Sequence, residues 1–430
     1  MTLTSPPDWQ LLRLGQLFRE RKEKGSDKDF PPLSVTMRGI VPQLETAAKT
    51  DDGDNRKVVR VGDYVINSRS DRKGSGGISD HEGSVSLISI VLQPRSIDPR
   101  FAHHLLRSPA FQEEFYRWGH GIVADLWTTR YADMKNIRLR VPDLSTQREI
   151  ADFLDRETAR IDLLIEKKQK LVVLLGEKWI ATLTSSVTGG QTSRTTELNP
   201  VLTLQERVHG KPKPIGWKTD KLHRVFRVRR SIKNTGMKED NLLSLSYGRI
   251  IQKDIQTSDG LLPENFEGYQ IVEPGNIVLR LTDLQNDKRS LRQGLVTQRG
   301  IITSAYDAVE VQRDNDARFW FYSLLALDLA KHYYSLGGGV RQSVKFADFP
   351  NDWIYCPDLS TQREIADLLD REAAKRDTLK DKTSASIDRL KEYRSALITA
   401  AVTGQIDVTT YAKSDATDRR LDAIQEEMGA

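Results

Sequence analysis

Apolar residues recur at helical spacing along two long stretches of the chain. In the first stretch they are Leu154, Ile161, Ile165, Val172, Leu175, Trp179 and Leu183. In the second stretch they are Ile365, Leu369, Leu379, Ile387, Leu390, Leu397 and Ala401, with a weaker patch of small residues at 383–386. Spacings near multiples of about 3.6 residues place such positions on one helix face. The pattern therefore predicts two long amphipathic helices.

Residues that start and stop helices bound both stretches. Pro142 and Pro357 mark the starts, because the residue before a proline is held in an extended conformation. Capping-box spacing follows each proline, in Thr146 with Glu149 and in Thr361 with Glu364. Gly189 and Gly404 mark the ends. We expect the two apolar faces to pack on each other as an antiparallel coiled coil. The alternative is that each helix packs on its own neighbouring domain.

The two helical stretches are copies of one sequence. Residues 142–159 read PDLSTQREIADFLDRETA, and residues 357–374 read PDLSTQREIADLLDREAA. Sixteen of these eighteen positions are identical at an offset of 215 residues, and the register holds to the VTG triplets at 187–189 and 402–404. The chain is therefore a tandem duplication.

The segments that precede the two copies have diverged but keep landmarks in the same order. A W-x4-L-x2-[LV]-F pattern opens each segment, at Trp9 and Trp217, and a glycine turn precedes a short apolar run, at Gly62 and Gly275. The other predicted elements are strands at 85–92 and 301–311 and helices at 101–118 and 319–336. Each diverged segment is therefore predicted to be an α/β domain.

Together these elements predict an α+β chain with a pseudo-twofold tandem repeat. Two α/β domains are separated by two long helices that form an antiparallel coiled coil. The predicted segments are a first domain (1–141), a first helix (142–190), a linker (191–213), a second domain (214–356), a second helix (357–406) and a tail (407–430). The tail is polar and acidic, which fits either a loose end or a helix that binds a partner.

The charge distribution separates the diverged segments from the repeated ones. The 430 residues carry a formal net charge of +5, with 29% charged residues. Residues 1–141 carry +4 and residues 200–356 carry +5, whereas 142–199 carry −1 and 357–430 carry −3. A polyanionic partner would therefore contact the diverged segments. Ordinary scatter of surface charge is the alternative explanation.

Cysteine usage and hydropathy restrict the compartment. Cys356 is the only cysteine, which excludes an internal disulfide and a cysteine-ligated zinc site. No run of about 18 apolar residues predicts a membrane span. Pro6, Pro7 and Asp8 stand where an export signal needs an apolar core. We therefore expect a cytoplasmic protein.

The sequence lacks the motifs of several catalytic classes. It contains no G-x-x-x-x-G-K-[ST], no [ND]-P-P-[YF] and no F-x-G-x-G, which argues against a phosphate-binding loop and against adenine methylation. His103 and His104 are adjacent, so they cannot share one helix face as metal ligands. Asp143 with Glu166 and Lys168 resembles a nuclease pattern, but a helix would separate these groups by about 35 Å. We assign no catalytic and no metal-binding residue.

Basic loops, most of them rich in glycine, are the remaining candidates for function. The predicted DNA-binding residues are Arg69, Arg72, Lys73 and Arg130 in the first domain, and Arg280, Arg341, Gln342 and Lys345 in the second. Such side chains bind phosphates and read base edges. A solvated turn is the alternative for any single loop. Both domains, however, carry such loops at matching positions.

The doubled and ordered motifs resemble those of a type I restriction-modification specificity subunit. The motifs are P-[DS]-L-x-x-Q-x-x-I at 142–150 and 357–365, the VTG ends, the tryptophan openings, the glycine turns and G-G-G-V-R-Q at 337–342. The resemblance covers the whole chain. It implies that each diverged domain is a target recognition domain for one half of a split DNA site, and that the helices set the gap between the half-sites.

The resemblance also implies partners and a roughly circular arrangement closed at the termini. Two modification (methyltransferase) subunits would dock on the helices, and restriction/translocase subunits would join them on double-stranded DNA. S-adenosylmethionine, ATP and magnesium would belong to those partners, so we expect no cofactor and no enzymatic activity in this chain. The expected docking residues are Gln147, Arg148, Asp152, Gln362, Arg363 and Asp367.

Two other functions fit the same pattern. The chain could serve a methylation-only or other defence system that lacks a motor. It could also be a duplicated scaffold adaptor that holds two protein partners and never touches DNA. Recovery of a motor subunit in a pull-down would exclude the first alternative. Salt-dependent binding to duplex DNA would exclude the second.

Overall fold

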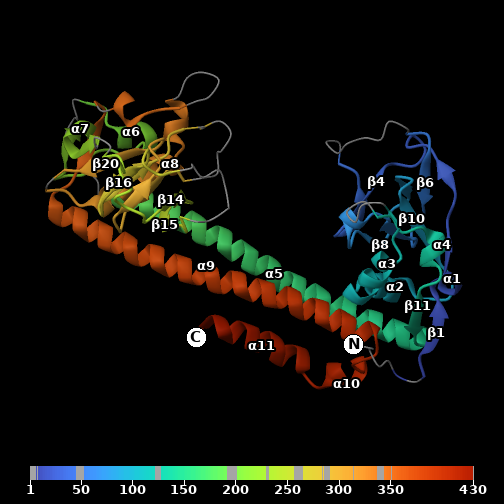
Figure 1. Cartoon of the computed structure of the whole chain (residues 1–430). Coiled ribbons are helices and arrows are strands. Elements are labelled where there is room, and N and C mark those ends of the chain that lie inside the picture. Colours follow the sequence, from blue (N-terminus) through green and yellow to red (C-terminus); the bar gives the residue numbers. More distant parts are fainter. Residues whose placement is uncertain are drawn as a thin grey trace. The chain divides into compact units, whose positions relative to one another are not determined.

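The computed structural model describes most of residues 1–430 as two compact units (Figure 1). The residues outside the description are 1–5, 7, 45–52, 122–126, 191–200, 229–231, 256–264, 283, 285–290, 313, 337–342, 350 and 430, with the side chains of 427–429. Unit 1 contains Met1–Leu171 and Asp381–Ala430, and unit 2 contains Val172–Lys380. The bounds predicted for separate domains and a linker remain predictions.

Unit 1 is built around a four-stranded antiparallel sheet. Its strand order is β2 (Phe18–Glu20), β10 (Ser89–Pro94), β7 (Tyr64–Asn67) and β8 (Gly76–Ile78). Smaller sheets pair β1 (Gln10–Arg13) with β11 (Arg138–Val141), β4 (Leu33–Thr36) with β5 (Gly39–Pro42), and β6 (Arg56–Val59) with β3 (Lys24–Gly25) and β9 (Gly83–Val85). The short helices are α1 (Leu14–Leu17), η1 (Ser70–Arg72), α2 (Pro99–Arg107), α3 (Pro109–Arg117) and α4 (Tyr131–Met134).

Unit 2 repeats this plan. Its four-stranded sheet has the order β13 (Phe226–Val228), β20 (Asp307–Val311), β17 (Asn276–Leu279) and β18 (Gln293–Leu295). The smaller pairs are β12 (Lys218–Lys221) with β21 (Trp353–Cys356), β14 (Leu243–Ser246) with β15 (Arg249–Gln252), and β16 (Gln270–Val272) with β19 (Gly300–Ile302). The helices are α6 (Leu204–His209), α7 (Leu222–Val225), α8 (Ala317–Leu329), η4 (His332–Ser335) and η5 (Phe346–Asp348). The mixed fold and its duplication are confirmed.

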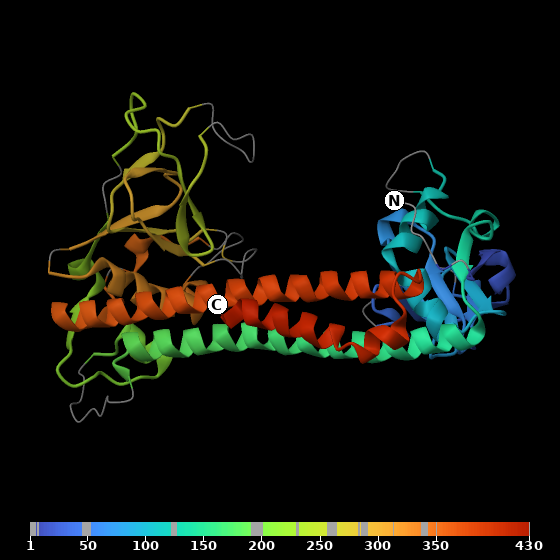
Figure 2. The same ribbon diagram turned by 90° about the horizontal axis from the view of Figure 1, so that it is seen from below.

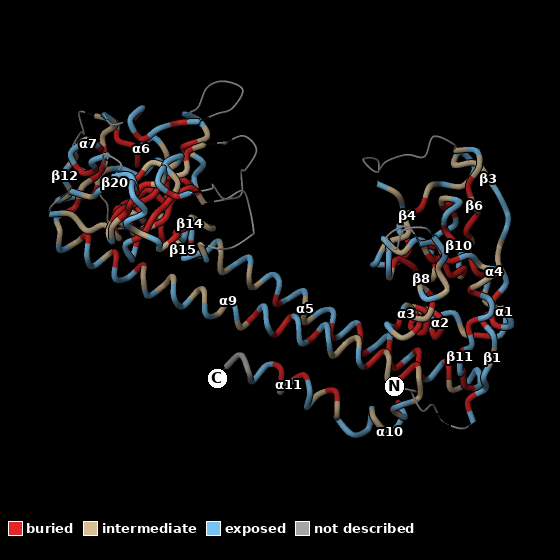
Figure 3. The backbone as a smooth tube through the Cα atoms, in the orientation of Figure 1, coloured by how far each residue is buried: buried red, intermediate tan, exposed pale blue. Residues whose placement is uncertain are grey.

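Both faces of each four-stranded sheet are buried. Along β7, Tyr64 and Ile66 enter the core with the helices, whereas Val65 packs with Val59 and Val85 of the smaller sheet. Alternation follows from the period of two residues in a strand. β17 repeats it, with its odd-numbered positions 277 and 279 on one side and position 278 on the other. Figure 3 shows the resulting buried strands in both units.

Turns divide the two predicted strands and one of the predicted helices. The apolar runs 85–92 and 301–311 each form two strands, because the N–H of Ser89 bonds back to Ser86 and that of Tyr306 bonds back to Thr303. The run 101–118 forms two helices, because Pro109 forces the preceding Ser108 into an extended conformation with ψ of 144°. Apolar content alone did not show these interruptions.

The predicted glycine turns lead into the central strands β7 and β17. The glycine of each turn has a φ of +88°, which a residue with a side chain rarely adopts. The carboxylate of Asp63 accepts a hydrogen bond from the N–H of Arg60 at 2.9 Å, and the amide of Asn276 accepts one from the N–H of Glu273 at 2.9 Å. The two turns therefore share the same glycine conformation and the same type of side-chain hydrogen bond.

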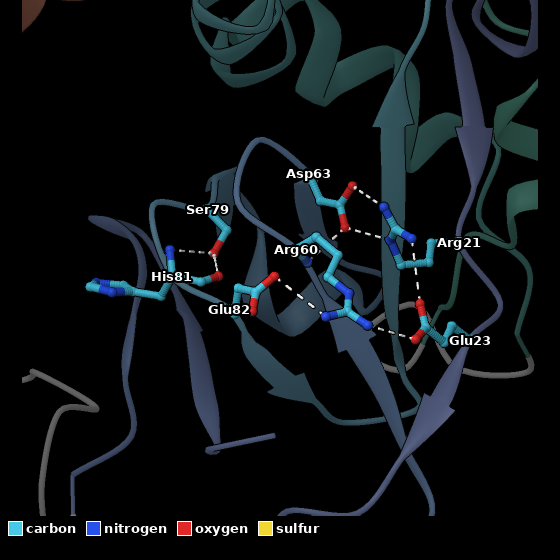
Figure 4. Close-up of polar contacts among 7 residues, drawn as sticks. All are labelled: Arg21, Glu23, Arg60, Asp63, Ser79, His81 and Glu82. Atoms are coloured by element: carbon cyan, nitrogen blue, oxygen red, sulfur yellow. Dashed lines mark hydrogen bonds and ion pairs between the residues drawn. The ribbon is translucent and has the colours of Figure 1, made fainter. Parts of the chain in front are cut away.

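An ion pair beside these turns occurs in both units with its charges exchanged. In unit 1 Arg60 bonds to Glu82 at 3.4 Å and to Glu23 at 2.9 Å (Figure 4). The positions aligned with Arg60 and Glu82 are Glu273 and Arg299, which also form an ion pair. The ion pair is present in both units, but the basic and the acidic residue occupy exchanged positions.

The long helices are α5 (Leu144–Val187) and α9 (Leu359–Val402), each of 44 residues. Asp143 caps α5 by accepting hydrogen bonds from the N–H of Ser145 at 2.8 Å and of Thr146 at 3.0 Å. Asp358 caps α9 in the same way. The hydrogen bonds from Thr146 lower the pKa of Asp143. The predicted capping boxes at Thr146 and Thr361 are wrong, because both helices begin before them.

The two long helices lie side by side within each unit (Figure 2). In unit 1 the guanidinium of Arg394 bonds to Asp162 at 2.8 Å. In unit 2 the guanidinium of Arg376 lies 4.4 Å from the ring centre of Trp179. At these contacts the residue numbers decrease along α9 as they increase along α5. This confirms the predicted antiparallel pair.

The predicted helix stops at Gly189 and Gly404 are confirmed, and each lies against the opening of a sheet domain. The two glycines have φ of +88° and +72°. A Cβ on Gly189 would lie 2.1 Å from Cγ of Pro214, and one on Gly404 would lie 2.3 Å from Cδ of Pro6. Both openings form the same turn, with a bond of 3.2 Å from a tryptophan N–H to the proline carbonyl.

The tail forms two helices, α10 (Val408–Lys413) and α11 (Ala416–Gly429), that belong to unit 1. Leu421 and Ile424 of α11 are each only 1% exposed. The tail is therefore a packed element and not a loose end. Within the described part of the chain, no helix has both the length and the apolarity needed to cross a membrane.

Replacing Gly404 by alanine tests the junction between α9 and the first domain. The positive φ and the nearby Pro6 should make Gly404→Ala destabilising by about 1–3 kcal/mol. Gly176→Ala is the matched control, because this helical glycine has no atom within 4 Å of the added Cβ and the change should stabilise by about 0.5–1 kcal/mol. Urea unfolding followed by circular dichroism measures both. Equal midpoints for the two variants would contradict the assignment.

Candidate nucleic-acid interface

The predicted basic loop of unit 1 lies beside the segment that ends at Arg130. The N–H of Thr129 donates to the carbonyl of Ser68 at 3.0 Å. Arg69 and Thr128 form a β-bridge next to this bond. Two loops that are far apart in the sequence therefore place Arg69 and Arg130, both exposed, on one part of the surface.

Unit 2 joins its predicted loops through the same hydrogen bond. The N–H of Val344 donates to the carbonyl of Leu281 at 2.9 Å. Val344 aligns with the donor in unit 1 at an offset of 215, and Leu281 aligns with the acceptor at 213. This bond places Arg280 and Lys345 next to each other along the backbone. The structure thus brings the predicted loops together in both units.

Arg130 and Lys345 occupy equivalent positions in the two units. Arg130 precedes α4 with φ of −92° and ψ of 154°, and Lys345 precedes η5 with φ of −106° and ψ of 151°. Both side chains are exposed. An exposed cation held by an ordered loop can contact a phosphate without a large loss of backbone entropy. These two residues are the strongest of the predicted DNA contacts.

The other predicted contacts differ in how far their charge is already paired. Lys73 forms an ion pair with Glu113 and lies 5.9 Å from the ring centre of Tyr116. Arg72 is exposed and lies 3.7 Å from its neighbour Asp71. Arg280 is half-buried. Arg341 and Gln342 lie outside the described residues.

The structure corrects the placement of two predicted docking residues, Gln147 and Gln362. They are only 2% and 1% exposed. The Gln147 amide accepts from the N–H of Asp98 at 2.8 Å and donates to the carbonyl of Pro142 at 2.8 Å. Gln362 accepts from the N–H of Asp316 at 2.8 Å. Both amides therefore point into their own unit and are not on an exposed docking face.

The repeated aspartates also bind within their own unit. Asp152 accepts from Arg100 at 2.6 Å, and Asp367 accepts from Arg318 at 2.8 Å. The hydrogen bond to Asp152 raises the pKa of Arg100. The remaining predicted docking residues are exposed: Arg148, which lies 3.8 Å from Asp98, and Arg363. A docking role for these four residues stays a prediction.

The adjacent histidines of α2 also form contacts within unit 1. His104 Nε2 lies 2.7 Å from Oδ1 of Asp155, and this hydrogen bond lowers the pKa of Asp155. Burial lowers the pKa of His103 to about 3, while its Nδ1 accepts a hydrogen bond from the N–H of Ile78 at 3.3 Å. Among the described residues, no group of three or more His, Cys, Asp or Glu is placed to hold a metal ion.

Sequence reasoning missed two hairpin turns that carry exposed large side chains. Met37, between β4 and β5, is 69% exposed, and Tyr247, between β14 and β15, is 79% exposed. The two hairpins align at an offset of 210, with LSVTM in one and LSLSY in the other. This local similarity was a signal that could have identified them. An apolar or aromatic side chain at such a tip can contact bases.

A basic groove of about 730 Å³ runs beside the hairpin turn of unit 1. Its lining includes Arg38 of the turn, Arg107 of α2, and Lys391 and Arg394 of α9, together with Asp162 of α5, which pairs with Arg394. Arg107 also donates to the carbonyl of Gly76 at 3.1 Å. The concentration of cations suits a polyanion more than a neutral ligand.

Comparison with known proteins identifies the fold. No family model and no curated protein matches the sequence. A chain from a structure on complex assembly and conformational transition of the type I R-M system matches with a TM-score of 0.61 and 16% identity, over 94% of this chain and 100% of the other. This chain shares the fold of that protein.

Two further solved structures match most of this chain at lower TM-scores. The HsdS subunit from Thermoanaerobacter tengcongensis matches at 17% identity and a TM-score of 0.49, over 94% of this chain and 99% of the other. The S subunit from M. genitalium matches at 13% identity and a TM-score of 0.40, over 93% and 98%.

The substitution Gln362→Ala tests whether the buried amides stabilise the fold. The change leaves the partly buried N–H of Asp316 without its acceptor, which should cost about 1–3 kcal/mol of unfolding free energy. Arg363→Ala removes the exposed neighbour and should stay within about 0.5 kcal/mol of the parent. Thermal and urea unfolding measure the difference. If Gln362 only served an external partner, both variants would be as stable as the parent.

Proposed function

We propose that this chain is the non-catalytic DNA-specificity subunit of a type I restriction-modification complex. Each unit carries one target recognition domain, and each domain reads one half of a bipartite DNA site. The observation that carries the proposal is the repeated hydrogen bond that gathers basic loops in both units, at Thr129 and at Val344. The framework of this interface is shared, whereas its exposed side chains differ. Such a pair of interfaces can read two different half-sites.

The chemistry of recognition divides between two kinds of residue. Arg130 and Lys345 contact phosphates and fix the position of each domain, because phosphate contacts carry no direct sequence information. The hairpin tips at Met37 and Tyr247 and the neighbouring arginines reach base edges. The different tips, one flexible thioether and one aromatic ring, then favour different bases.

Catalysis in this proposal belongs to partner subunits. Two modification subunits bind the long helices and supply S-adenosylmethionine-dependent methylation, and restriction/translocase subunits use ATP and magnesium. Support comes from the type I R-M fold across 94% of the chain. The structure that shares this fold concerns complex assembly. A methylation-only system would use the same chain without the motor, and recovery of a motor subunit in a pull-down decides between the two.

Exchange of residues 1–141 for the corresponding domain of another such protein tests the function. The methylated sequence in cells should change in one half-site only, because the second domain stays unchanged. Sequencing of methylated bases measures it. The exchange of 214–356 is the reciprocal control and should change the other half-site. A methylation pattern that is unaffected by both exchanges would favour the scaffold adaptor.

Charge removal at the repeated cation position tests the phosphate contacts. Arg130→Gln and Lys345→Gln should each lower the slope of log affinity against log salt by about 0.9, since each removes one phosphate contact. The methylated sequence should stay the same. Lys22→Gln, an exposed lysine beside Glu20, is the control and should keep the parental slope. Fluorescence anisotropy on duplex DNA with the complete complex measures the slopes. Parental slopes in both variants would remove these residues from the interface.

A further inference from the structure

Residues 280–282 of unit 2, which we call the recognition segment, are held by one buried arginine. The guanidinium of Arg292 donates to the carbonyl of Thr282 at 3.2 Å. The backbone carbonyl of Arg292 accepts a hydrogen bond from the N–H of Arg280 at 2.7 Å. Leu281, between these two residues, accepts the hydrogen bond that joins the two candidate loops of unit 2. Arg292 therefore contacts the chain on both sides of the residue that joins the loops.

The burial of Arg292 is complete, with 0% of the residue exposed. Its guanidinium lies 5.6 Å from the ring centre of Tyr334, and its Nε donates to the Tyr334 hydroxyl at 3.4 Å. An arginine is almost never fully buried unless its charge and its donors are satisfied. These contacts leave the guanidinium little freedom to move. A guanidinium fixed in this way also fixes the carbonyl of Thr282 to which it donates.

Asp328 of α8 holds the backbone of the same arginine. Its Oδ2 accepts a hydrogen bond from the N–H of Arg292 at 2.7 Å, and the residue is 1% exposed. Its Oδ1 has no hydrogen-bond partner among the described residues. Burial raises the pKa of Asp328 to about 6, and the hydrogen bond from Arg292 opposes this shift. Burial of an ionised carboxylate costs folding free energy, so stability alone does not account for a carboxylate at this position.

Unit 1 has the same backbone contact without the buried charges. A glycine stands two residues after each of Ser75 and Arg292, and the two glycines pair with aligned residues of β7 and β17. The carbonyl of Ser75 accepts from the N–H of Asn67 at 3.0 Å, which is the equivalent of the backbone bond in unit 2. Asp328 aligns with Ala110 at an offset of 218. Serine and alanine supply neither a long donor nor a carboxylate.

The connection from the recognition segment to β18 is longer than its counterpart in unit 1. The offset between the units rises from 213 at Leu281 to 217 at Gly294, so unit 2 has four additional residues in this connection. A longer connection loses more conformational freedom when its ends are fixed. The side chain and the backbone of Arg292 fix these ends in unit 2. The additional contacts therefore occur in the unit with the longer connection.

We propose that Arg292 and Asp328 are positioning residues that set the recognition segment of the second domain, and thereby its choice of bases in one half-site. Both residues are buried, so they act through the segment and not by contact with DNA. Asp328 holds Arg292, and Arg292 holds the segment that lies next to Lys345. The effect on base choice rests on the proposed function, whereas the ordering of the segment does not.

Hydrogen–deuterium exchange of the full-length chain tests the ordering without DNA. Arg292→Met keeps an extended side chain but cannot donate to Thr282, so the N–H of Val344 should lose at least about tenfold in protection. The N–H of Thr129, which makes the equivalent bond in unit 1, should keep its protection. Ser75→Ala is the matched control and should change neither amide, because Ser75 acts through its backbone carbonyl. Parental protection of Val344 in Arg292→Met would overturn the proposal.

The charge of Asp328 gives a second test, which holds even if Arg292→Met does not fold. Asp328→Asn is nearly isosteric and keeps an acceptor for the N–H of Arg292, but it removes the charge that strengthens this bond. The charged and titratable groups that face Asp328 are Arg292, Lys331 and Tyr333. These three do not titrate near pH 6. Protection of Val344, corrected for the intrinsic rate, should fall in the parent as the pH drops through about 6. In Asp328→Asn it should be low at every pH.

Overall stability should follow the opposite trend with pH. Burial raises the pKa of Asp328 above its unfolded value, so the neutral carboxyl favours the folded state. This contribution is complete below about pH 4 and is lost as the pH rises through about 6. The parent should therefore lose more stability between pH 5 and pH 8 than Asp328→Asn does, as measured by urea unfolding. Protection of Val344 that only follows overall stability would overturn the positioning role.

Sequencing of methylated bases, in cells that express the complete system, tests the consequence for recognition. Arg292→Met should lower discrimination by roughly tenfold at one or more positions of the half-site read by the second domain. The other half-site should stay unchanged, and Ser75→Ala should change neither. The exchange of residues 214–356 identifies which half-site the second domain reads. Lost discrimination in both half-sites, or in neither, would overturn the positioning role.

The two kinds of measurement separate this proposal from the proposed function. Methylation that is the same in cells with and without the chain would refute the proposed function, while the exchange measurements on the chain alone would stand. Methylation that depends on the chain but is unaffected by Arg292→Met would refute only the positioning role.

Discussion

A buried side-chain amide helps to hold each long helix to the sheet domain that precedes it. Gln147 accepts from the N–H of Asp98, and Asp98 in turn caps α2. Gln362 repeats this contact with Asp316, which caps α8. Together with the ion pairs of the repeated aspartates, the amide holds the start of each long helix against its own domain. The loops at the candidate interface depend on this frame, because they are carried by the same domain.

This constraint gives an internal reason for the similarity of the two repeats. The glutamine and the aspartates of the repeated segment bind residues of their own unit, among them Arg100 and Arg318. The glutamine contacts are partly buried, so an unpaired partner would be costly there, whereas the ion pairs of the two aspartates are exposed. Similarity between the repeats therefore does not need two identical external partners, although it is compatible with them. The loops are free of this requirement and have diverged.

Periodicity and duplication predicted the largest features because these depend on many residues at once. The long helices, their antiparallel pairing and the glycine stops follow from regular patterns. Features that depend on one contact were missed. The cap at Asp143 precedes the expected Thr146, and the inward direction of Gln147 requires knowledge of Asp98. The packing of α11 could not be predicted either, because the surface of α5 and α9 on which it packs is formed by residues that are distant from it in the sequence.

The exchanged ion pair has a consequence for how such a chain can be inherited. Arg60 faces Glu82 in one unit, and Glu273 faces Arg299 in the other. Recombination inside a domain that exchanged only one member of the pair would set two arginines or two glutamates against each other. Recombination within the nearly identical segments at 142–159 and 357–374 would instead transfer a whole domain with its own ion pairs. A crossover within the repeated segments therefore keeps each ion pair whole, whereas a crossover inside a domain can separate its two members.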